Sequence, residues 1–359
     1  MSNPTKFTVE RHDLSSDKSL QAWSAADEYL LQYAHSATKS SEHIAVYNDR
    51  FGYLTCHLEA ANTTTILTAK SQEKAVLANM AANQLTKPTF ANPLTPMETK
   101  ADLALIKMPK SHELFQLFLE HIVVNSTKDS SVVCAFMTKH FSPRIIEIAS
   151  KYYNEVSQTK AQKKARLLTL KGKKEKEVST ITRNIHFSNQ DYKQYAGVFS
   201  ANHIDYATQF FLEHLIVREE DQRILDLASG NGVIANEILK NHPDKEMHLI
   251  DDAYLAVASA KLNCDAKNVH HHWDNNLESF SDNSFDLIVS NPPFHFEYEV
   301  NIQITLALFK ECLRCLNKGG HLQVVANKHL NYMVHLKPLF ATVNVIAEDK
   351  KYIVYQCVK

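Results

Sequence analysis

The residues with the most specific chemistry form a polar turn directly after a short apolar segment. Residues 285–289 are typical of a strand that a parallel sheet buries on both faces, and the two prolines at 292 and 293 cannot donate to a sheet ladder. The strand must therefore end in the turn Asn291-Pro292-Pro293-Phe294. Ligands bind at the carboxyl edge of an open α/β sheet, so we expect this turn to belong to a binding site.

This turn has the groups needed to recognise and activate an exocyclic amine. The side-chain oxygen of Asn291 and the backbone carbonyl of Pro292 can accept both hydrogens of one NH2 group, and Phe294 offers a stacking face to a planar ring. Such stacking is worth about 1–3 kcal/mol per base. Two acceptors draw the nitrogen from planar towards tetrahedral geometry, which frees its lone pair to attack a methyl donor. The structural alternative is an Asn-Pro turn that only closes a strand.

A second turn has the composition of a donor-binding loop. The segment Arg223–Leu227 predicts a buried strand, and residues 228–232 form a tight turn before a helix. The small residues Ala228, Gly230 and Gly232 let backbone N–H groups approach a ligand closely at the amino end of that helix. We expect them to line the pocket of the methyl donor.

Acidic and amide side chains follow the next two predicted strands. Asp251 ends the strand at 247–250, 19 residues after Gly232, where a carboxylate can bind both hydroxyls of a ribose. Asp274 and Asn275 follow the strand Val269–Trp273 and suit an adenine amine. Taken singly, the two acids could also be a helix cap and a turn residue. A glycine turn alone fits a nicotinamide cofactor too, but the turn at Asn291 favours S-adenosylmethionine, because a hydride enzyme has no use for two acceptors aimed at an amine.

Short apolar strands alternate with helices in both halves of the chain, which indicates an α/β fold of βαβ units. In the first half we expect a helix at 19–34 and strands at 43–47, 64–68, 102–106, 132–137 and 166–170, and between the halves a strand at 178–187 and a loop at 188–199. The halves also match in sequence: Asp102 lies opposite Asp286, Lys107 opposite Asn291, Gly52 opposite Gly232, and the Lys-His pair at 139–140 opposite the pair at 328–329. We interpret this as a duplication that gave two tandem Rossmann-like domains, 1–175 and 176–359, the first of which has lost its chemistry and holds RNA or assists folding. Two unrelated α/β domains are the alternative.

Composition excludes several classes of protein. The 359 residues are 44% hydrophobic with net charge −1, and no charged-then-apolar leader or apolar run of 18 residues occurs, so we expect a cytoplasmic protein without a membrane segment. We also expect a monomer. Six scattered cysteines predict buried thiols rather than disulfides or zinc. Three consecutive histidines, at 270–272, would point to alternate faces of a strand and make a poor chelate, so no metal is expected.

A basic segment lies between the two halves. Residues 158–184 contain nine Lys or Arg and two Glu, a local charge of +7. Such a run can be a solvated linker or can bind phosphates. The residues that we assign to RNA binding are Lys163, Lys164, Arg166, Lys173 and Lys174.

These motifs resemble the bacterial ribosomal RNA guanine-N2 methyltransferases of the RlmG/RsmC family over essentially the whole chain. The shared features include Asn-Pro-Pro-Phe-His at 291–295 and an inactive amino-terminal copy of the catalytic domain. Four further segments resemble the large-subunit type, namely 230–233, 256–263, 326–332 and 163–167. The resemblance implies class I methyltransferase domains that transfer a methyl group from S-adenosylmethionine to the N2 of one guanine in 23S rRNA.

The resemblance also implies roles for individual residues. Asn291 and Pro292 would hold the guanine amine and Phe294 would stack on the base, with Asn291 also bordering the donor. The donor would be lined by Asp226, Gly230 and Gly232 at its methionine end, by Asp251 at the ribose and by Asp274 with Asn275 at the adenine, while Phe199 and Ser200 would close one side. One departure is Ala228-Ser229, where the family usually has Gly-Cys. The added methyl could narrow the donor pocket.

Several alternative functions remain open from sequence. The small-subunit type would methylate 16S rRNA, and an Asn-Pro-Pro-aromatic turn also serves methylation of a DNA adenine N6 or of a glutamine amide. A non-catalytic RNA-binding scaffold that kept the fold belongs to a different class. Binding of S-adenosylmethionine separates that scaffold from the enzymes.

Overall fold

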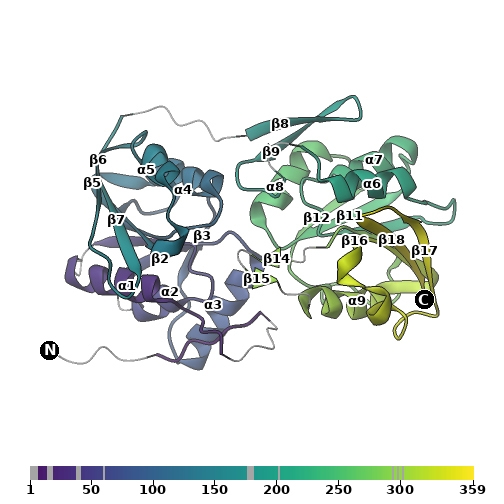
Figure 1. Cartoon of the computed structure of the whole chain (residues 1–359), viewed down its shortest axis with the longest axis horizontal. Coiled ribbons are helices and arrows are strands. Elements are labelled where there is room, and N and C mark those ends of the chain that lie inside the picture. Colours follow the sequence, from purple (N-terminus) through teal and green to yellow (C-terminus); the bar gives the residue numbers. More distant parts are fainter. Residues whose placement is uncertain are drawn as a thin grey trace. The chain divides into compact units, whose positions relative to one another are not determined.

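The computed structural model describes residues 7–13, 19–37, 42–59, 61–175, 182–200, 203–292, 295–296, 299–300 and 303–359, with side chains for all but 295–296 and 299–300. The chain divides into two compact units, Met1–Ile181 and Thr182–Lys359 (Figure 1). Among the described residues, no helix has both the length and the apolar character needed to cross a bilayer.

Each unit contains a seven-stranded sheet, and the two sheets have the same strand order. The first is β3-β2-β1-β4-β5-β7-β6 and the second is β12-β11-β10-β13-β16-β18-β17. In both, five parallel strands are followed by an antiparallel pair at one edge. Numbered within its own unit, each sheet reads 3-2-1-4-5-7-6. The predicted α/β class with two Rossmann-like domains is confirmed.

The elements of the first unit are α1 Ala25–Ala37, β1 His43–Tyr47, α2 Tyr53–His57, β2 Asn62–Ile66, α3 Lys70–Ala82, β3 Thr89–Ala91, β4 Ala101–Lys107, α4 His112–Asn125, β5 Ser126–Met137, η1 Thr138–His140, α5 Pro143–Ala149, β6 Tyr153–Gln158 and β7 Ala165–Lys173.

The elements of the second unit are the hairpin β8 Thr182–Phe187 and β9 Gln190–Tyr195, then α6 Tyr206–His214, β10 Arg223–Leu227, α7 Val233–Asn241, β11 Glu246–Asp251, α8 Tyr254–Asn263, β12 Val269–Trp273, β13 Phe285–Ser290, β14 His295–Phe296, β15 Glu299–Val300, α9 Gln303–Cys315, β16 Leu316–Asn327, η2 Lys328–Leu330, α10 Met333–Leu336, β17 Thr342–Glu348 and β18 Tyr352–Val358.

The duplicated aspartate performs the same structural task in both units. Asp102 accepts a hydrogen bond from the backbone N–H of His43, the first residue of β1, at 3.0 Å. Asp286 accepts one from Arg223, the first residue of β10, at 2.9 Å. Each carboxylate therefore joins the start of the first strand of its sheet to the fourth strand. The aspartate shared by the two units therefore has a structural role in anchoring these strands.

The turns after β1 and β10 also share their backbone shape. Gly52 and Gly232 both precede a helix, with φ of 81° and 80°. A Cβ on Gly232 would lie 3.2 Å from Ala260 Cβ and 3.2 Å from a Leu249 methyl, so the helix could not pack as closely with a larger residue. The sequence predicted that Gly52 and Gly232 are equivalent, and their shared backbone conformation before a helix agrees with that prediction.

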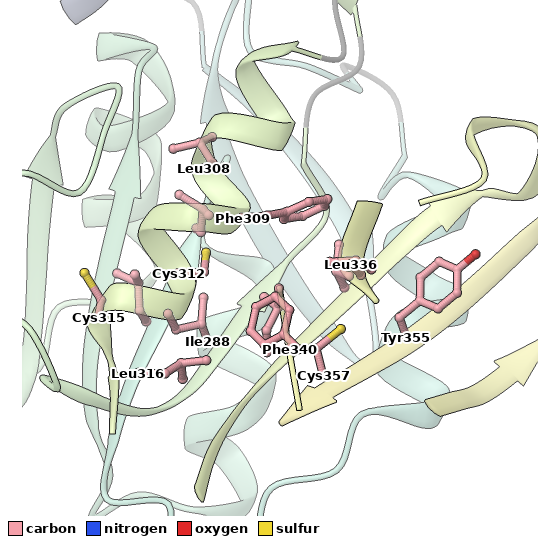
Figure 2. Packing of buried hydrophobic residues seen from close by; sticks show 14 of the residues in the cluster. Ile288, Leu308, Phe309, Cys312, Cys315, Leu316, Leu336, Phe340, Tyr355 and Cys357 are labelled. Carbon is pink, nitrogen blue, oxygen red and sulfur yellow. The ribbon is translucent and has the colours of Figure 1, made fainter. Parts of the chain in front are cut away.

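Helices cover both faces of the second sheet, and the strand residues alternate between them. Leu225 and Leu227 face a cluster built with α9 and α10, whereas Ile224 faces one built with α6, α7 and α8. Figure 2 shows Cys312 and Cys315 on α9 and Cys357 on β18 inside the first of these clusters. All six cysteines are free and buried, which confirms the prediction of buried thiols.

Some elements differ from the sequence prediction. The loop expected at 188–199 contains β9, which completes a hairpin with β8. The first helix, expected at 19–34, begins at Ala25, and neither β3 nor β6 was expected. The lysine-histidine pairs at 139–140 and 328–329, aligned by sequence, are one residue out of register, because η1 begins at Thr138 and η2 at Lys328.

Candidate active site

The four predicted site segments meet at the carboxyl edge of the second sheet. Leu227, at the end of β10, is paired with Ile250 of β11 on one side and with Ser290 of β13 on the other. The buried Ser290 hydroxyl donates to the Leu227 carbonyl at 2.8 Å, which fixes the two strand ends together. Because β12 pairs with β11 through Trp273 and Asp251, the residues after all four strands lie along one edge.

Asn291 leaves β13 with both hydrogens of its side-chain amide engaged. Its Nδ2 donates to Asp205 Oδ2 at 3.1 Å and to Thr208 Oγ1 at 2.9 Å. Asp205 caps the amino end of α6, and Thr208 lies in its first turn. The amide oxygen is therefore the atom that Asn291 can offer to a substrate. Pro292 is buried, and Phe294 lies outside the described residues.

Asp226 is a fully buried carboxyl group on β10 with one unused oxygen. Its Oδ2 accepts a hydrogen bond from the Ala235 backbone N–H at 3.2 Å, while Oδ1 has no partner among the described residues. Burial raises the pKa of Asp226 to about 7, and the nearby Asp251 adds to the rise. An unpaired buried acceptor is costly, so this position fits a ligand that brings a charged donor.

Asp251 connects the end of β11 to the glycine turn. Its two carboxylate oxygens accept from the backbone N–H of Gly230 at 2.9 Å and of Ala253 at 2.8 Å. Burial raises the pKa of Asp251 to about 6 against these two hydrogen bonds, and Asp252 raises it further. A Cβ built on Gly230 would meet nothing within 4 Å, so the turn borders open space. The two hydrogen bonds hold the Asp251 carboxylate against the glycine turn.

The remaining predicted donor residues follow β12 and the hairpin. Asn275 Oδ1 is buried without a partner among the described residues, and its backbone N–H donates to Asp274 Oδ1 at 2.7 Å. An unused amide oxygen there fits the amine of an adenine. Phe199 lies in the loop before α6 with 77% of its surface exposed, so its side chain is open to solvent rather than closed over a pocket.

Gln194 is a site residue that sequence reasoning missed. Its Oε1 accepts from Asn231 Nδ2 in the glycine turn at 3.0 Å, and its Nε2 donates to the Ser200 carbonyl at 3.4 Å. This side chain joins the donor turn to the loop that carries Phe199. The loop prediction for 188–199 hid Gln194, because only a strand places it on a defined face.

Both halves of the chain match known protein families. Residues 1–174 match the model described as RLMG N-terminal domain, and residues 189–356 match the model described as Methyltransferase small domain. Proteins named Ribosomal RNA large subunit methyltransferase G are 31% identical in Photobacterium profundum and 30% identical in Pseudoalteromonas translucida. Both alignments cover 98% of this chain and 96% of the relative.

The chain belongs to the ribosomal RNA large subunit methyltransferase G family. It is accordingly an S-adenosylmethionine-dependent methyltransferase. In fold it is similar to the T. thermophilus 16S rRNA N2 methyltransferase (RsmC), solved in complex with AdoMet and guanosine. The TM-score is 0.77 with 20% identity, and the match covers 94% of this chain and 92% of that one.

In this methyltransferase G family member, the first unit lacks the polar groups of the site. The strand pairings put Val46 at the position of Asp226 and Leu67 at that of Asp251, and both are buried apolar residues. Lys107 stands at the position of Asn291. The unit has no carboxylates at these two positions with which to hold a donor.

Ala228, in the glycine turn after β10, has an unfavourable backbone conformation. Its φ is 60°, a left-handed conformation that costs a residue with a Cβ about 1–2 kcal/mol. We expect Ala228→Gly to raise the free energy of unfolding by about 0.5–1 kcal/mol in denaturant titrations, because the relieved strain exceeds the added unfolded-state entropy. Ala258→Gly is the control, since Ala258 lies inside α8 without a positive φ and glycine in a helix interior should destabilise. Equal destabilisation by both would contradict the strain.

The basic residues assigned to RNA binding have internal partners in several cases. Lys173 Nζ donates to the carbonyls of Val123 and Ser126, at 3.2 and 2.9 Å, and so caps the carboxyl end of α4. Lys174 donates to the Ser150 carbonyl, which follows α5, and Lys163 pairs with Glu28 at 2.9 Å. Arg166 donates to Gln158. Their role in RNA binding stays a prediction.

The histidines of β12 lie next to His248 on β11, which the sequence reasoning did not consider. Ligand atoms of Glu246, His248 and His270 lie within 4.8 Å of one another. However, Arg223 Nε lies 3.1 Å from Glu246 Oε1 and 3.2 Å from His248 Nε2. The guanidinium already supplies a positive charge at this place, which disfavours a cation.

Proposed function

We propose that this protein transfers a methyl group from S-adenosylmethionine to the exocyclic N2 of one guanine in 23S rRNA. The observation that carries the proposal is the engagement of both Asn291 amide hydrogens by Asp205 and Thr208, which leaves the amide oxygen to accept from an amine. The names of the relatives support the large subunit. The guanosine and AdoMet in the similar T. thermophilus protein support guanine and the donor.

The reaction needs no strong general base. Asn291 Oδ1 and the Pro292 carbonyl would accept the two N2 hydrogens, which localises the lone pair on the nitrogen. The nitrogen would then form a bond to the methyl carbon that the donor supplies, and the electron pair of the broken carbon–sulfur bond would leave with sulfur. The methylated amine is left with one proton too many, which passes to water. The donor supplies an electrophilic methyl group bound to a sulfonium.

Polar groups at three strand ends along the carboxyl edge of the sheet would hold the donor. Asp226 Oδ1 would accept from the α-ammonium of its methionine part, and Asp251 would accept from the ribose hydroxyls. Asn275 Oδ1 would accept from the adenine amine. Two of these three acceptors are buried without a partner among the described residues. A base inside an RNA helix must first be unstacked to reach Asn291, at a cost of a few kcal/mol.

The proposal is tested by mapping 2-methylguanosine in ribosomal RNA from cells that lack the protein. Loss of one 2-methylguanosine from 23S rRNA, restored by the wild type and not by an Asn291 variant, would support it. Loss from 16S rRNA would favour the small-subunit reaction instead. Loss from neither, with methylation of duplex DNA or a protein glutamine by the purified enzyme, would overturn the substrate assignment.

The role of the basic segment is tested with a matched pair of lysines. Lys164 is exposed and its side chain has no partner among the described residues, whereas Lys173 caps α4. We expect Lys164→Glu to weaken binding of an rRNA fragment several-fold in a filter or anisotropy assay, without changing thermal stability or donor affinity. Lys173→Glu should mainly lower thermal stability, because it removes the hydrogen bonds to the carbonyls at the end of α4. Unchanged RNA binding by the stable Lys164 variant would remove the segment from the RNA interface.

A further inference from the structure

We infer that Asp205 and Thr208 are positioning residues that fix which end of the Asn291 amide faces the substrate; this inference rests on the proposed amine methylation. An asparagine amide offers an acceptor at one end and two donors at the other, and the two ends have nearly the same shape. An inverted Asn291 would point N–H groups at the substrate amine, two donors against two donors. Activation of an amine thus needs something that prevents inversion.

Asp205 supplies that constraint because a carboxylate only accepts hydrogen bonds. Its Oδ2 lies 3.1 Å from Asn291 Nδ2 and would face the amide oxygen if the amide turned over. Thr208 Oγ1, buried at 6% exposure, takes the second hydrogen at 2.9 Å. Together they form an acceptor pair, Asp205 and Thr208, three residues apart on the first turn of α6. The inverted amide would lose the hydrogen bond to Asp205 and place two oxygens in contact, whereas the Thr208 hydroxyl could still donate to the inverted oxygen. Asp205 therefore sets the direction of the amide, and Thr208 holds its position.

The first unit has an equivalent pair of acceptors, which hold a lysine in place of an asparagine. Ser24 and Asp27 stand at the start of α1 with the same three-residue spacing, and Lys107 of β4 donates to both, at 2.8 Å to the Ser24 hydroxyl. Lys107 occupies the position of Asn291. Both units therefore hold a nitrogen donor from the end of the fourth strand between two side-chain oxygens at the start of the helix that precedes the first strand of the sheet. Only in the second unit does the held side chain keep a spare oxygen.

The contact also depends on α6 being correctly capped. The same Asp205 Oδ2 accepts from the backbone N–H of Ala207 at 3.1 Å, so the carboxylate joins the helix end to Asn291. Removing it outright could loosen the helix as well as the amide. The informative variants are those that keep the cap or the side-chain volume and change only the acceptor.

The test compares Thr208→Val with Thr208→Ser in purified full-length protein, using guanine-N2 methylation of rRNA as the readout. We expect Thr208→Val to lower kcat about tenfold with unchanged S-adenosylmethionine affinity, and Thr208→Ser, which keeps the hydroxyl, to remain near wild type. In Asp205→Ser the shorter side chain can still cap the helix but cannot reach Asn291. In Asp205→Asn the side chain keeps an oxygen at the same distance from the backbone. We therefore expect Asp205→Ser to lower kcat more than Asp205→Asn.

A double-mutant cycle separates positioning from structure. With Asn291 already replaced by alanine, there is no amide to orient, so Thr208→Val should lower the residual rate no further. An additional tenfold loss in that background, or a wild-type rate for Thr208→Val and Asp205→Ser, would overturn the inference. Absence of guanine-N2 methylation by the wild type itself would instead overturn the proposed function, and the two failures are thereby distinguishable.

Discussion

Replacing Asn291 with alanine is expected to lower the methylation rate by about 100- to 10,000-fold, the range typical of a positioned group that acts on the reacting atom. The variant loses the amide oxygen that accepts from the guanine amine, so the nitrogen lone pair stays conjugated with the ring. Asp205 and Thr208 would keep their places on α6, because the helix cap to Ala207 does not involve Asn291. The measurement is single-turnover transfer of a labelled methyl group to rRNA.

S-adenosylmethionine affinity provides the internal check on this variant. The expected change in Kd, measured by calorimetry, is less than tenfold, because Asp226, Asp251 and the glycine turn are untouched. Lys107→Ala is the matched control, since Lys107 stands at the same position in the first unit. It should leave kcat unchanged once the variant is shown to be folded. A comparable loss of kcat in both variants would contradict a catalytic role specific to the second unit. Full activity of Asn291→Ala would show that Asn291 is not needed for the reaction.

The sequence was sufficient to predict the sheet and the edge where the site forms, because both depend on local signals. The end of an apolar strand can be predicted from sequence where Asn-Pro-Pro or a glycine turn follows it. The carboxyl ends of parallel strands lie at the same edge of the sheet. The observed β10 and β12 have the predicted bounds. The hairpin β8–β9 was half missed, since β9 is the polar sequence Gln-Asp-Tyr-Lys-Gln-Tyr and lacks an apolar run.

The residues that act on others could not be found from local patterns. Asp205 contacts Asn291 from 86 positions away in the chain, and Gln194 contacts Asn231 from 37 away. A helix cap predicts only that Asp205 accepts from its own helix. The spacing of Asp205 and Thr208 repeats that of Ser24 and Asp27, and this was the one signal present in the sequence. Its meaning required the fourth strand of each sheet to be placed beside that helix.

Charge was the weakest guide. The segment 158–184 has a net charge of +7, yet the ammonium groups of Lys173 and Lys174 donate to the carbonyls at helix ends. A count of lysines cannot separate a phosphate-binding surface from a set of helix caps, because both place positive charge near oxygen atoms. The burial of Asp226 could not be predicted from sequence either, because nothing in the residues of a strand shows that an acidic side chain on it will be fully buried.

Asp226→Asn is expected to change stability and donor binding in opposite directions. Burial raises the pKa of Asp226 to about 7, whereas an aspartate in an unfolded chain titrates near 3.9. The folded state therefore holds the proton more tightly. The stabilising effect of the protonated form is fully present below about pH 4 and is lost as the pH rises through 7, so above neutrality the fold carries the cost of a buried carboxylate.

Asparagine avoids that cost because it does not ionise. Raising a pKa from about 4 to about 7 is worth about 4 kcal/mol, so the stability of the variant relative to wild type should increase by up to that amount between pH 4 and pH 8. Urea titrations of the donor-free protein at several pH values measure the difference, and terms independent of pH cancel in it. Asp251, which titrates near 6, is present in both proteins. A difference that stays flat with pH would contradict the raised pKa.

Donor affinity should respond in the reverse sense. A hydrogen bond to a charged group is worth about 1.5–3 kcal/mol, so replacing the carboxylate should weaken S-adenosylmethionine binding about 10- to 100-fold above pH 7. The wild-type Kd should fall as the pH rises from 6 to 8, because binding of the ammonium requires the ionised acid, and the Kd of the variant should vary less. The buried carboxylate at Asp226 then costs stability in the free protein in return for charge complementarity with the donor. Unchanged S-adenosylmethionine affinity in the variant would contradict this role, because Asp226 Oδ1 would then not bind the donor's ammonium group.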